Sequence, residues 1–280
     1  MAYKNLCFAA TGDPGSFVGQ GVRQVADLGA DGRRRTTVTP FHELPRRARV
    51  YVLAVVCVGG AALAAAVTLA PPPAQGAASL FIVLAILAGL VRVPVPVGGT
   101  LSPAYAFVLA TLMCFGLGAS VIASVASAVI ASTARASGQF RVSLHQAAFN
   151  AGCVALASGL SGVLYLALGG PIGEIDPVRH SATILAASAA FSVLNISLVS
   201  LAIRLSGPGV AVPSLRANFV WSVPSFLASA SLAVLLALLV QHEHLVSLLF
   251  AAPFVYLMHS AYRARARQAE EEKRHSQETA

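Results

Sequence analysis

The chain has 280 residues, of which 56% are hydrophobic and 11% are charged, with a mean hydropathy of +0.74. An average soluble domain carries about 25% charged residues, so this composition excludes an ordinary soluble protein and indicates a polytopic membrane protein. The formal net charge is +8. The basic residues flank apolar segments instead of gathering on one polar surface, which argues against nucleic-acid binding.

Residues 1–44 show no apolar periodicity and contain the consecutive arginines Arg33, Arg34 and Arg35. We expect this stretch to be a disordered cytoplasmic tail. The apolar run near Met1 is too short for the core of a signal peptide, so no cleavage is expected there. Pro45 then suits the first turn of a helix, where a missing N–H breaks no hydrogen bond.

Eight apolar segments follow within residues 45–262, and most have the roughly 17 to 25 residues that a helix needs to cross a bilayer. Only Gly116 to Gly118 separates the third from the fourth, so these two could instead form one long helix and leave seven crossings. We expect an all-α bundle of eight transmembrane helices, at residues 50–70, 77–93, 101–117, 119–136, 143–168, 181–205, 217–240 and 245–261.

The distribution of basic residues distinguishes eight crossings from seven. With eight crossings and a cytoplasmic N-terminus, all of the 19 Lys and Arg residues except Arg179 face the cytoplasm. Fusing the third and fourth segments would split them nearly evenly between the two sides. The positive-inside rule therefore favours eight crossings with both termini in the cytoplasm.

Small residues line two sides of the fourth segment. Rows of small side chains let helix backbones approach closely, so we expect this helix to pack against neighbours along both rows. One row comprises Ser120, Ser124, Ala128 and Ser132, and the other comprises Ala123, Ser127 and Ala131.

The apolar segments lack the groups that catalysis or ion coupling requires. All 11 acidic residues lie outside them, which argues against a proton- or cation-coupled pump. The sequence has no GxSxG, P-loop, HExxH or dinucleotide-binding motif, so we expect neither enzymatic activity nor a cofactor. The four cysteines form no CxxC pair and are interpreted as small apolar residues.

Polar side chains within the apolar segments are the candidates for sensing or binding a ligand. Interhelical hydrogen bonding is the simpler explanation for most of them, although a histidine could also act as a proton-sensitive switch. These candidates are His145, Gln146 and Asn150 in the fifth segment, Asn195 in the sixth, Asn218 and Trp221 in the seventh, and His259 in the eighth.

Two outward-facing loops carry histidines and carboxylates and would bind a divalent metal only if they met. Hydrated loop residues are the simpler explanation, so we expect no metal site. The residues are Glu174, Asp176 and His180 in one loop, and His242, Glu243 and His244 in the other.

On the cytoplasmic side, a bend containing Gly98, Gly99, Thr100 and Ser102 precedes the third helix. Ser102 is a suitable N-cap and Pro103 a suitable first helical residue. The bend is either simply a well-formed loop or, through exposed N–H groups at the helix start, an anion site.

The last stretch begins as the eighth apolar segment and continues as a charged helix over residues 263–280. An unbroken helix over residues 245–275 would be roughly 45 Å long, so a third or more of it would project beyond a hydrocarbon core of roughly 30 Å. Such a rod could carry a movement out of the membrane. The residues assigned to this relay, several at helix-favouring four-residue spacing, are Arg263, Arg267, Glu270, Glu271 and Arg274.

Several short motifs resemble one bacterial group. They are Phe41 with Leu44-Pro45 and Tyr51, the bend from Gly98 to Ser102, the Phe149-Asn150 pair, and Tyr262-Arg263 leading into Glu270-Glu271-Glu272-Lys273-Arg274-His275. They are similar to the N-terminal membrane-sensor (MASE-type) modules that precede HD-GYP phosphodiesterase or GGDEF diguanylate cyclase domains. The bend also resembles the substrate-binding subunits of vitamin transporters.

The MASE-type resemblance implies a multi-helix input domain whose last helix passes a signal to a cyclic-di-GMP enzyme in the cytoplasm. No HD-GYP or GGDEF motif occurs in the 280 residues, so the output domain is expected outside this sequence or in a partner protein. The apolar positions of residues 263–280 form no heptad, so a homodimer would depend on the spans or on that output domain. A small-molecule transporter or substrate-capture subunit is the alternative function.

Overall fold

A computed structural model describes residues 41–74, 76–90, 93–95, 99–101, 103–133, 144–206 and 215–242, without the side chains of 93–95, 99–101 and 215–225. The fold over these ranges is helical apart from one small ribbon, which confirms the all-α prediction. The elements are η1 (Phe41–Glu43), α1 (Arg46–Leu69), α2 (Gly76–Leu90), β1 (Val93–Val95), β2 (Gly99–Leu101), α3 (Ala104–Phe115), α4 (Leu117–Thr133), α5 (Leu144–Ala167), α6 (Ser181–Leu205) and α7 (Leu215–Gln241).

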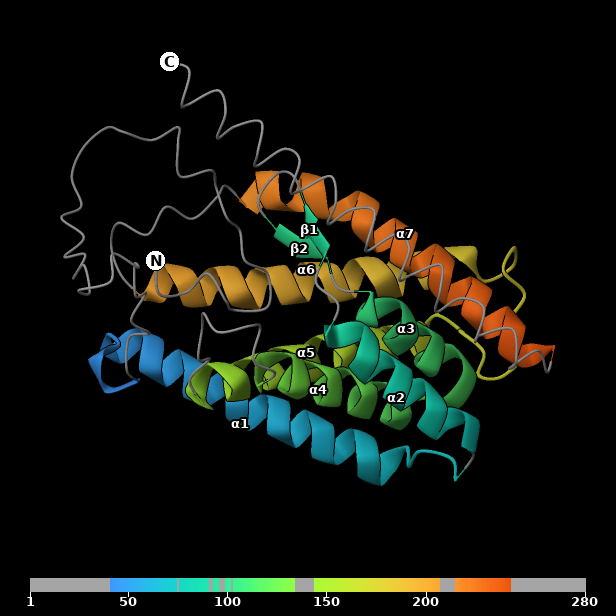
Figure 1. Ribbon diagram of the computed structural model, residues 1–280, viewed down its shortest axis with the longest axis horizontal. Helices are drawn as coiled ribbons and strands as arrows, with labels where there is room; N and C mark the ends of the chain where they lie inside the picture. The colour runs from blue at the N-terminus through green and yellow to red at the C-terminus, as the bar shows by residue number, and fades with distance from the viewer. Residues whose placement is uncertain are drawn as a thin grey trace, which may run out of the picture.

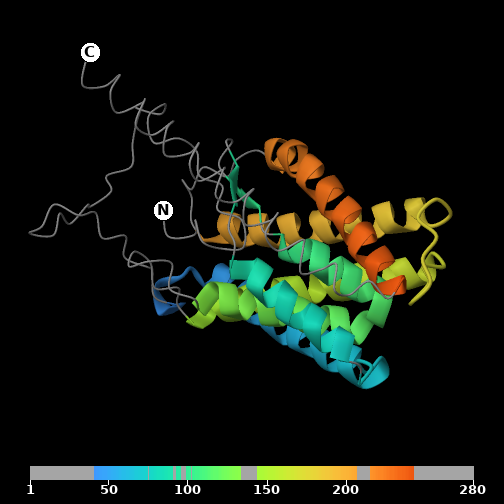
Figure 2. The same ribbon diagram turned by 45° about the vertical axis from the view of Figure 1, so that its right-hand side comes forward.

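The helices pack as a bundle around α4 and α5. Helix α5 contacts α1, α4 and α6, while α4 also contacts α1, α2 and α3. Helices α6 and α7 lie together on one side of the bundle, and α3 connects α7 to α2 and α4 (Figures 1 and 2). The largest hydrophobic cluster lies where α3, α6 and α7 meet, and it includes Phe81, Tyr105, Met113, Phe191 and Leu236.

The third and fourth apolar segments are two helices that fold back on each other. Gly116 separates α3 from α4 with a φ of 88°, in the left-handed region where glycine carries no steric penalty. The hydroxyl of Ser120 donates a hydrogen bond of 3.0 Å to the carbonyl of Val108, twelve residues earlier. One straight helix would place those residues roughly 18 Å apart, so the single-helix alternative is wrong.

The segments on either side of the bend are shorter than predicted. Helix α2 ends at Leu90 and α3 begins at Ala104, because Val93–Val95 and Gly99–Leu101 pair as an antiparallel ribbon. The N-cap position of α3 is Pro103, whose own side chain makes no capping hydrogen bond, while Ser102, the predicted N-cap, lies outside the described residues. The expected helix starting at Leu101, with Pro103 as its first helical residue, is therefore wrong by a few residues.

Close backbone crossings hold the central helices together. A Cβ atom added at Gly59 of α1 would lie 2.5 Å from the Cα of Gly152 in α5, and one added at Gly118 of α4 would lie 1.9 Å from the carbonyl oxygen of Ala70. These distances leave no space for any side chain. The packing of α1 against α5 and α4 therefore depends on glycine, as small-residue contacts between membrane helices do.

The small residues predicted to pack in α4 lie on two contact faces. The Ser124 hydroxyl donates to the Val154 carbonyl of α5 at 3.2 Å. On the other face, Ser127 lies opposite Gly89 of α2, where an added Cβ would come within 3.2 Å of the serine. Both faces are buried at Ser120, Ala123, Ser124, Ser127 and Ser132, which confirms the prediction for those positions.

Among the described residues, three helices are long and apolar enough to cross a membrane by length and composition, namely α1, α5 and α6. Large apolar side chains cover the outside of the bundle, among them Leu53, Val58 and Leu160, each more than half exposed. A soluble protein rarely exposes so much apolar surface. These features are those of a membrane protein; the predicted eighth segment, residues 245–261, lies outside the described residues.

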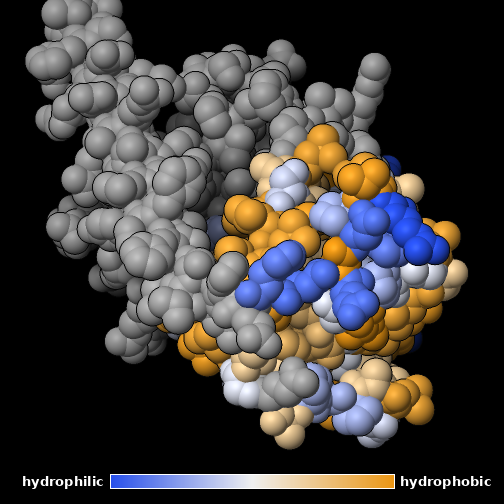
Figure 3. Space-filling view, turned by 90° about the vertical axis from the view of Figure 1, so that its right-hand side faces the viewer, coloured by the Kyte–Doolittle hydropathy of each residue, from blue (hydrophilic) through white to orange (hydrophobic). Residues whose placement is uncertain are grey.

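The two ends of the bundle differ in charge. One end holds the start of α1 and the end of α6, and with them the basic side chains Arg46, Arg47, Arg49 and Arg204. The other end holds the loop between α5 and α6, where the Gly173 N–H donates to the Met113 carbonyl and the Ile175 N–H to Gln241 Oε1. Figure 3 faces this second end and shows a hydrophilic patch within hydrophobic surface.

Candidate functional site

Asn150 forms a polar contact between α5 and α4. Its Nδ2 donates to the Ser132 hydroxyl at 3.2 Å, and both side chains are buried. Its Oδ1 is buried without a hydrogen-bond partner. The interhelical hydrogen bond expected for this residue is present, and one acceptor atom remains for a further interaction.

The start of α5 is joined to the chain entering α1. The ring of His145 lies 5.4 Å from that of Phe41, and the ring of Tyr51 lies 6.1 Å from that of Phe149. The Tyr51 hydroxyl also donates to the Leu198 carbonyl of α6 at 3.0 Å. Three helices therefore meet through aromatic side chains at the basic end of the bundle.

Two further polar groups lie in the same part of the chain. Gln146 is 3% exposed, and Arg49, near the start of α1, has a buried Nε with no hydrogen-bond partner. The first two turns of α5 thus carry His145, Gln146 and Asn150. Of these, Gln146 and Asn150 lie on the buried side of the helix. The sequence pattern predicted this grouping within the fifth segment, but not its contact with Phe41 and Tyr51.

Asn195 lies in α6, 2% exposed, and its Oδ1 has no hydrogen-bond partner. Two hydroxyls that sequence reasoning missed share this property, those of Tyr105 in α3 and Ser188 in α6. Ser188 lies close enough to the Tyr105 hydroxyl to interact with it, although neither oxygen meets hydrogen-bond geometry. The four-three spacing of Ser188, Ser192 and Asn195 was the available signal, since it predicts one polar face on a helix.

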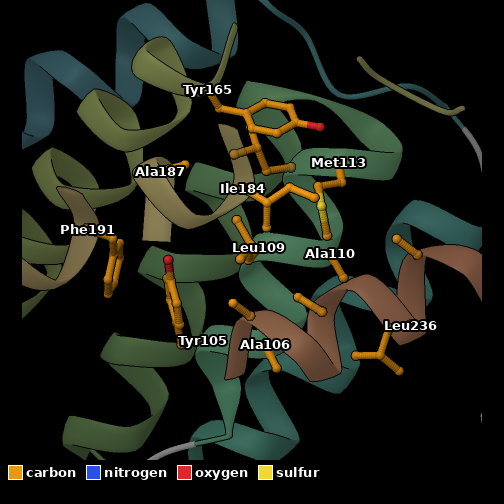
Figure 4. Packing of buried hydrophobic residues seen from close by; sticks show 14 of the residues in the cluster. Tyr105, Ala106, Leu109, Ala110, Met113, Tyr165, Ile184, Ala187, Phe191 and Leu236 are labelled. Carbon is orange, nitrogen blue, oxygen red and sulfur yellow. The ribbon is translucent and has the colours of Figure 1, made fainter. Parts of the chain in front are cut away.

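Aromatic rings surround the Tyr105 side chain. Phe191 of α6 stacks on it with ring centroids 4.3 Å apart, and Phe226 of α7 meets it edge-on at 5.6 Å. Figure 4 shows the Tyr105 oxygen pointing toward the part of α6 that carries Ala187. This region combines apolar ring surfaces with polar atoms that have no partner in the chain.

The loop between α5 and α6 uses its polar groups locally. Asp176 Oδ1 accepts hydrogen bonds from the N–H groups of Val178 and Arg179, and His180 Nδ1 lies 3.0 Å from the Asp176 carbonyl. No group of three or more His, Cys, Asp or Glu side chains that could hold a metal exists among the described residues. Glu243 and His244 of the second loop lie outside them.

Several predicted site residues cannot be placed with their side chains. Asn218 and Trp221 belong to the backbone of α7, and Gly99 and Thr100 to β2. The remaining ones lie outside the described residues: His259, Gly98, Ser102, Arg263, Arg267, Glu270, Glu271 and Arg274.

The described part of the bundle offers uncharged hydrogen-bonding groups within an apolar interior. Hydroxyl and amide groups in such surroundings bind and orient polar groups, whereas proton transfer needs a titratable group within reach. Comparison of the chain with family models, with curated proteins and with solved structures finds no match.

Proposed function

We propose that this protein is a membrane-embedded signal-input module that relays a stimulus to a cytoplasmic cyclic-di-GMP output domain. The observation that carries this proposal is the set of contacts at the start of α5. Asn150 contacts α4 within the bundle, while Phe149 and His145 contact Tyr51 and Phe41 at its basic end. A shift of α5 against α4 would therefore reach the basic end of the bundle, the end at which the relay helix is proposed to emerge.

The proposed topology has eight crossings with both termini in the cytoplasm. Its support is the placement of Arg46, Arg47, Arg49 and Arg204 at one end of the bundle and of Arg179 at the other. The described helices account for seven apolar segments, and residues 245–261 supply the eighth. Under the positive-inside rule, the basic end faces the cytoplasm of a bacterial inner membrane, and residues 263–280 emerge there as the relay helix.

Truncation of the relay helix tests the proposal. In cells that carry the complete signalling system, removal of residues 264–280 should abolish the stimulus-dependent change in cyclic-di-GMP, with insertion into the membrane fraction unchanged. A matched truncation of equal length at the other end, residues 2–18, should leave the response intact. An unchanged cyclic-di-GMP response after the first truncation contradicts the proposal.

A small-molecule transporter or substrate-capture subunit is the second candidate function. The observation that favours it is the set of buried, unpartnered oxygens of Tyr105, Ser188 and Asn195. A carrier would move its ligand across the membrane, whereas a sensor would only bind it. Uptake of a radiolabelled ligand into vesicles containing the purified protein distinguishes the two, because only a carrier accumulates label inside.

A further inference from the structure

Three buried oxygens on α3 and α6 have no hydrogen-bond partner. They are the Tyr105 hydroxyl, the Ser188 hydroxyl and Asn195 Oδ1, on side chains that are 9%, 3% and 2% exposed. Folded proteins leave few buried polar atoms unpaired, because desolvation without a new hydrogen bond is unfavourable. Three such atoms on two neighbouring elements therefore indicate a partner that the described residues do not supply.

The Tyr105 and Ser188 hydroxyls are neighbours, and Asn195 lies on the same face of α6, about 10 Å along the helix from Ser188. Ser188, Phe191 and Asn195 follow at three- and four-residue spacing, which places them on one face of α6. Tyr105 of α3 stacks on Phe191 and has Ser188 beside its hydroxyl. Phe226 of α7 closes the aromatic group from the third helix. The Tyr105 and Ser188 hydroxyls thus lie beside a group of aromatic rings to which α3, α6 and α7 each contribute. Figure 4 shows the rings of Tyr105 and Phe191.

The composition of this region defines the chemistry that fits it. Helix α3 contains no Lys, Arg, Asp or Glu, and the only such residue of α6 is Arg204, nine residues after Asn195, so a charged ligand would have no counter-ion on either helix near these oxygens. An amide oxygen only accepts hydrogen bonds, so Asn195 Oδ1 requires a donor, while the two hydroxyls can donate or accept. Ring faces favour a planar apolar body.

We propose that a small, uncharged, planar aromatic molecule carrying an N–H or O–H group binds between α3, α6 and α7. Its donor group pairs with Asn195 Oδ1, the Tyr105 hydroxyl donates to the face of its ring, and the ring packs with Phe191 and Phe226. The small side chains of Ala230 and Ala233 on α7 belong to the same cluster and let that helix adjust around the ligand. This inference goes beyond the proposed function, because a sensor and a carrier would use such a site equally.

Indole is the probe, because it is planar and uncharged and has one N–H donor; toluene, which has no donor, is its matched control. The full chain in detergent micelles or nanodiscs should show a concentration-dependent rise in its thermal unfolding midpoint with indole, and a much smaller one with toluene. Tyr105→Phe and Asn195→Leu should each weaken indole binding by about tenfold, the usual cost of removing one partner of a buried hydrogen bond.

Two control variants separate binding from folding. Ser192→Ala lies on the same helix, but its hydroxyl is already bonded to the Ser188 carbonyl at 2.8 Å, and Tyr51→Phe removes a phenol oxygen that is already bonded to the Leu198 carbonyl. Both should bind indole as the unaltered chain does. Because Tyr105→Phe keeps the ring and removes only an unpartnered oxygen, it should fold normally even if Asn195→Leu does not.

The proposal is overturned if indole at millimolar concentration leaves the unfolding midpoint unchanged, or if toluene stabilises the chain as much as indole. It is also overturned if Tyr105→Phe binds indole with unaltered affinity, since the oxygens would then have only water as their partner. These measurements report ligand binding alone. A negative result would not bear on the cyclic-di-GMP relay, which the truncation of residues 264–280 tests separately.

Discussion

Several buried polar side chains around α4 and α5 donate hydrogen bonds to neighbouring helices, although Asn150 Oδ1 accepts none, whereas the Tyr105 and Ser188 hydroxyls between α3 and α6 form no such bond. Ser120 donates to the Val108 carbonyl, Ser124 to the Val154 carbonyl, and Asn150 to Ser132. By contrast, the oxygens of Tyr105 and Ser188 have no partner. In the first region, hydrogen bonds from polar side chains hold the helices together. In the second region, the polar oxygens have no hydrogen-bond partner among the described residues.

The two regions also differ in how closely their backbones approach. Helices α1 and α5 cross at Gly59 and Gly152, where an added Cβ would meet backbone atoms. The contact between α3, α6 and α7 is made by aromatic side chains instead. Aromatic side chains can change rotamer, whereas two backbones in direct contact cannot adjust without separating the helices. We therefore expect the region around α1 and α5 to be rigid and the region between α3, α6 and α7 to be adaptable.

Substitution at the α1–α5 crossing should have the largest effect. Gly152→Ala places a Cβ 2.8 Å from the Val55 carbonyl oxygen, so the helices must separate, and we expect a loss of about 3 kcal/mol in the free energy of unfolding. Gly159→Ala, on the same helix with open space around its Cα, should change it by less than about 1 kcal/mol. Equal effects in an unfolding titration would show that the crossing is not close.

Removing the amide of Asn150 should have an intermediate effect. Asn150→Ala and Ser132→Ala should each destabilise the bundle, with a coupling free energy of about 1 kcal/mol between them, as for other hydrogen bonds between membrane helices. The double-mutant cycle measures this coupling directly. Additive losses would mean that the two side chains do not bond to each other.

A smaller effect is expected at Tyr51. Tyr51→Phe removes the hydrogen bond to the Leu198 carbonyl while retaining the ring contact with Phe149, and should cost about 1 kcal/mol or less. Thermal unfolding of the variant checks this value. A more stable variant would show that the hydroxyl is not used for structure.

The smallest effect is expected at Tyr105, the matched position in the other region. Without ligand, Tyr105→Phe removes an oxygen that has no partner, so stability should stay unchanged or rise by less than about 1 kcal/mol. The comparison with Tyr51→Phe is sensitive because the chemical change is the same. If Tyr51→Phe and Tyr105→Phe lower the free energy of unfolding equally, the proposed difference in hydrogen bonding between the two regions is wrong.

Much of the fold was predictable from residue order alone. Apolar length located the helix Ser181–Leu205, and the small residues of α4 predicted its packing faces, because both features are local. Helix α1 begins at Arg46, four residues before the apolar segment, since a helix can continue into water where hydropathy falls. The ribbon of β1 and β2 was not predicted, because strand pairing depends on contacts between separate segments.

The candidate site was predictable only in part. Asn150 and Asn195 stand out as amides in apolar segments, and both are buried. Tyr105 and Ser188 did not stand out, because tyrosine and serine are common packing residues in membrane helices. Whether their hydroxyls find partners depends on how α3 and α6 are rotated against each other, and that rotation is a property of the assembled bundle.

The orientation of the bundle is the central claim, because it decides on which side of the membrane the relay helix emerges. Single cysteines at Glu174 and Glu43, exposed at opposite ends, test it with a membrane-impermeant thiol reagent on intact cells, in a background with the native cysteines replaced. We predict that Glu174→Cys is labelled in intact cells and that Glu43→Cys is labelled only after the membrane is permeabilised. Labelling of Glu43→Cys in intact cells would contradict the account.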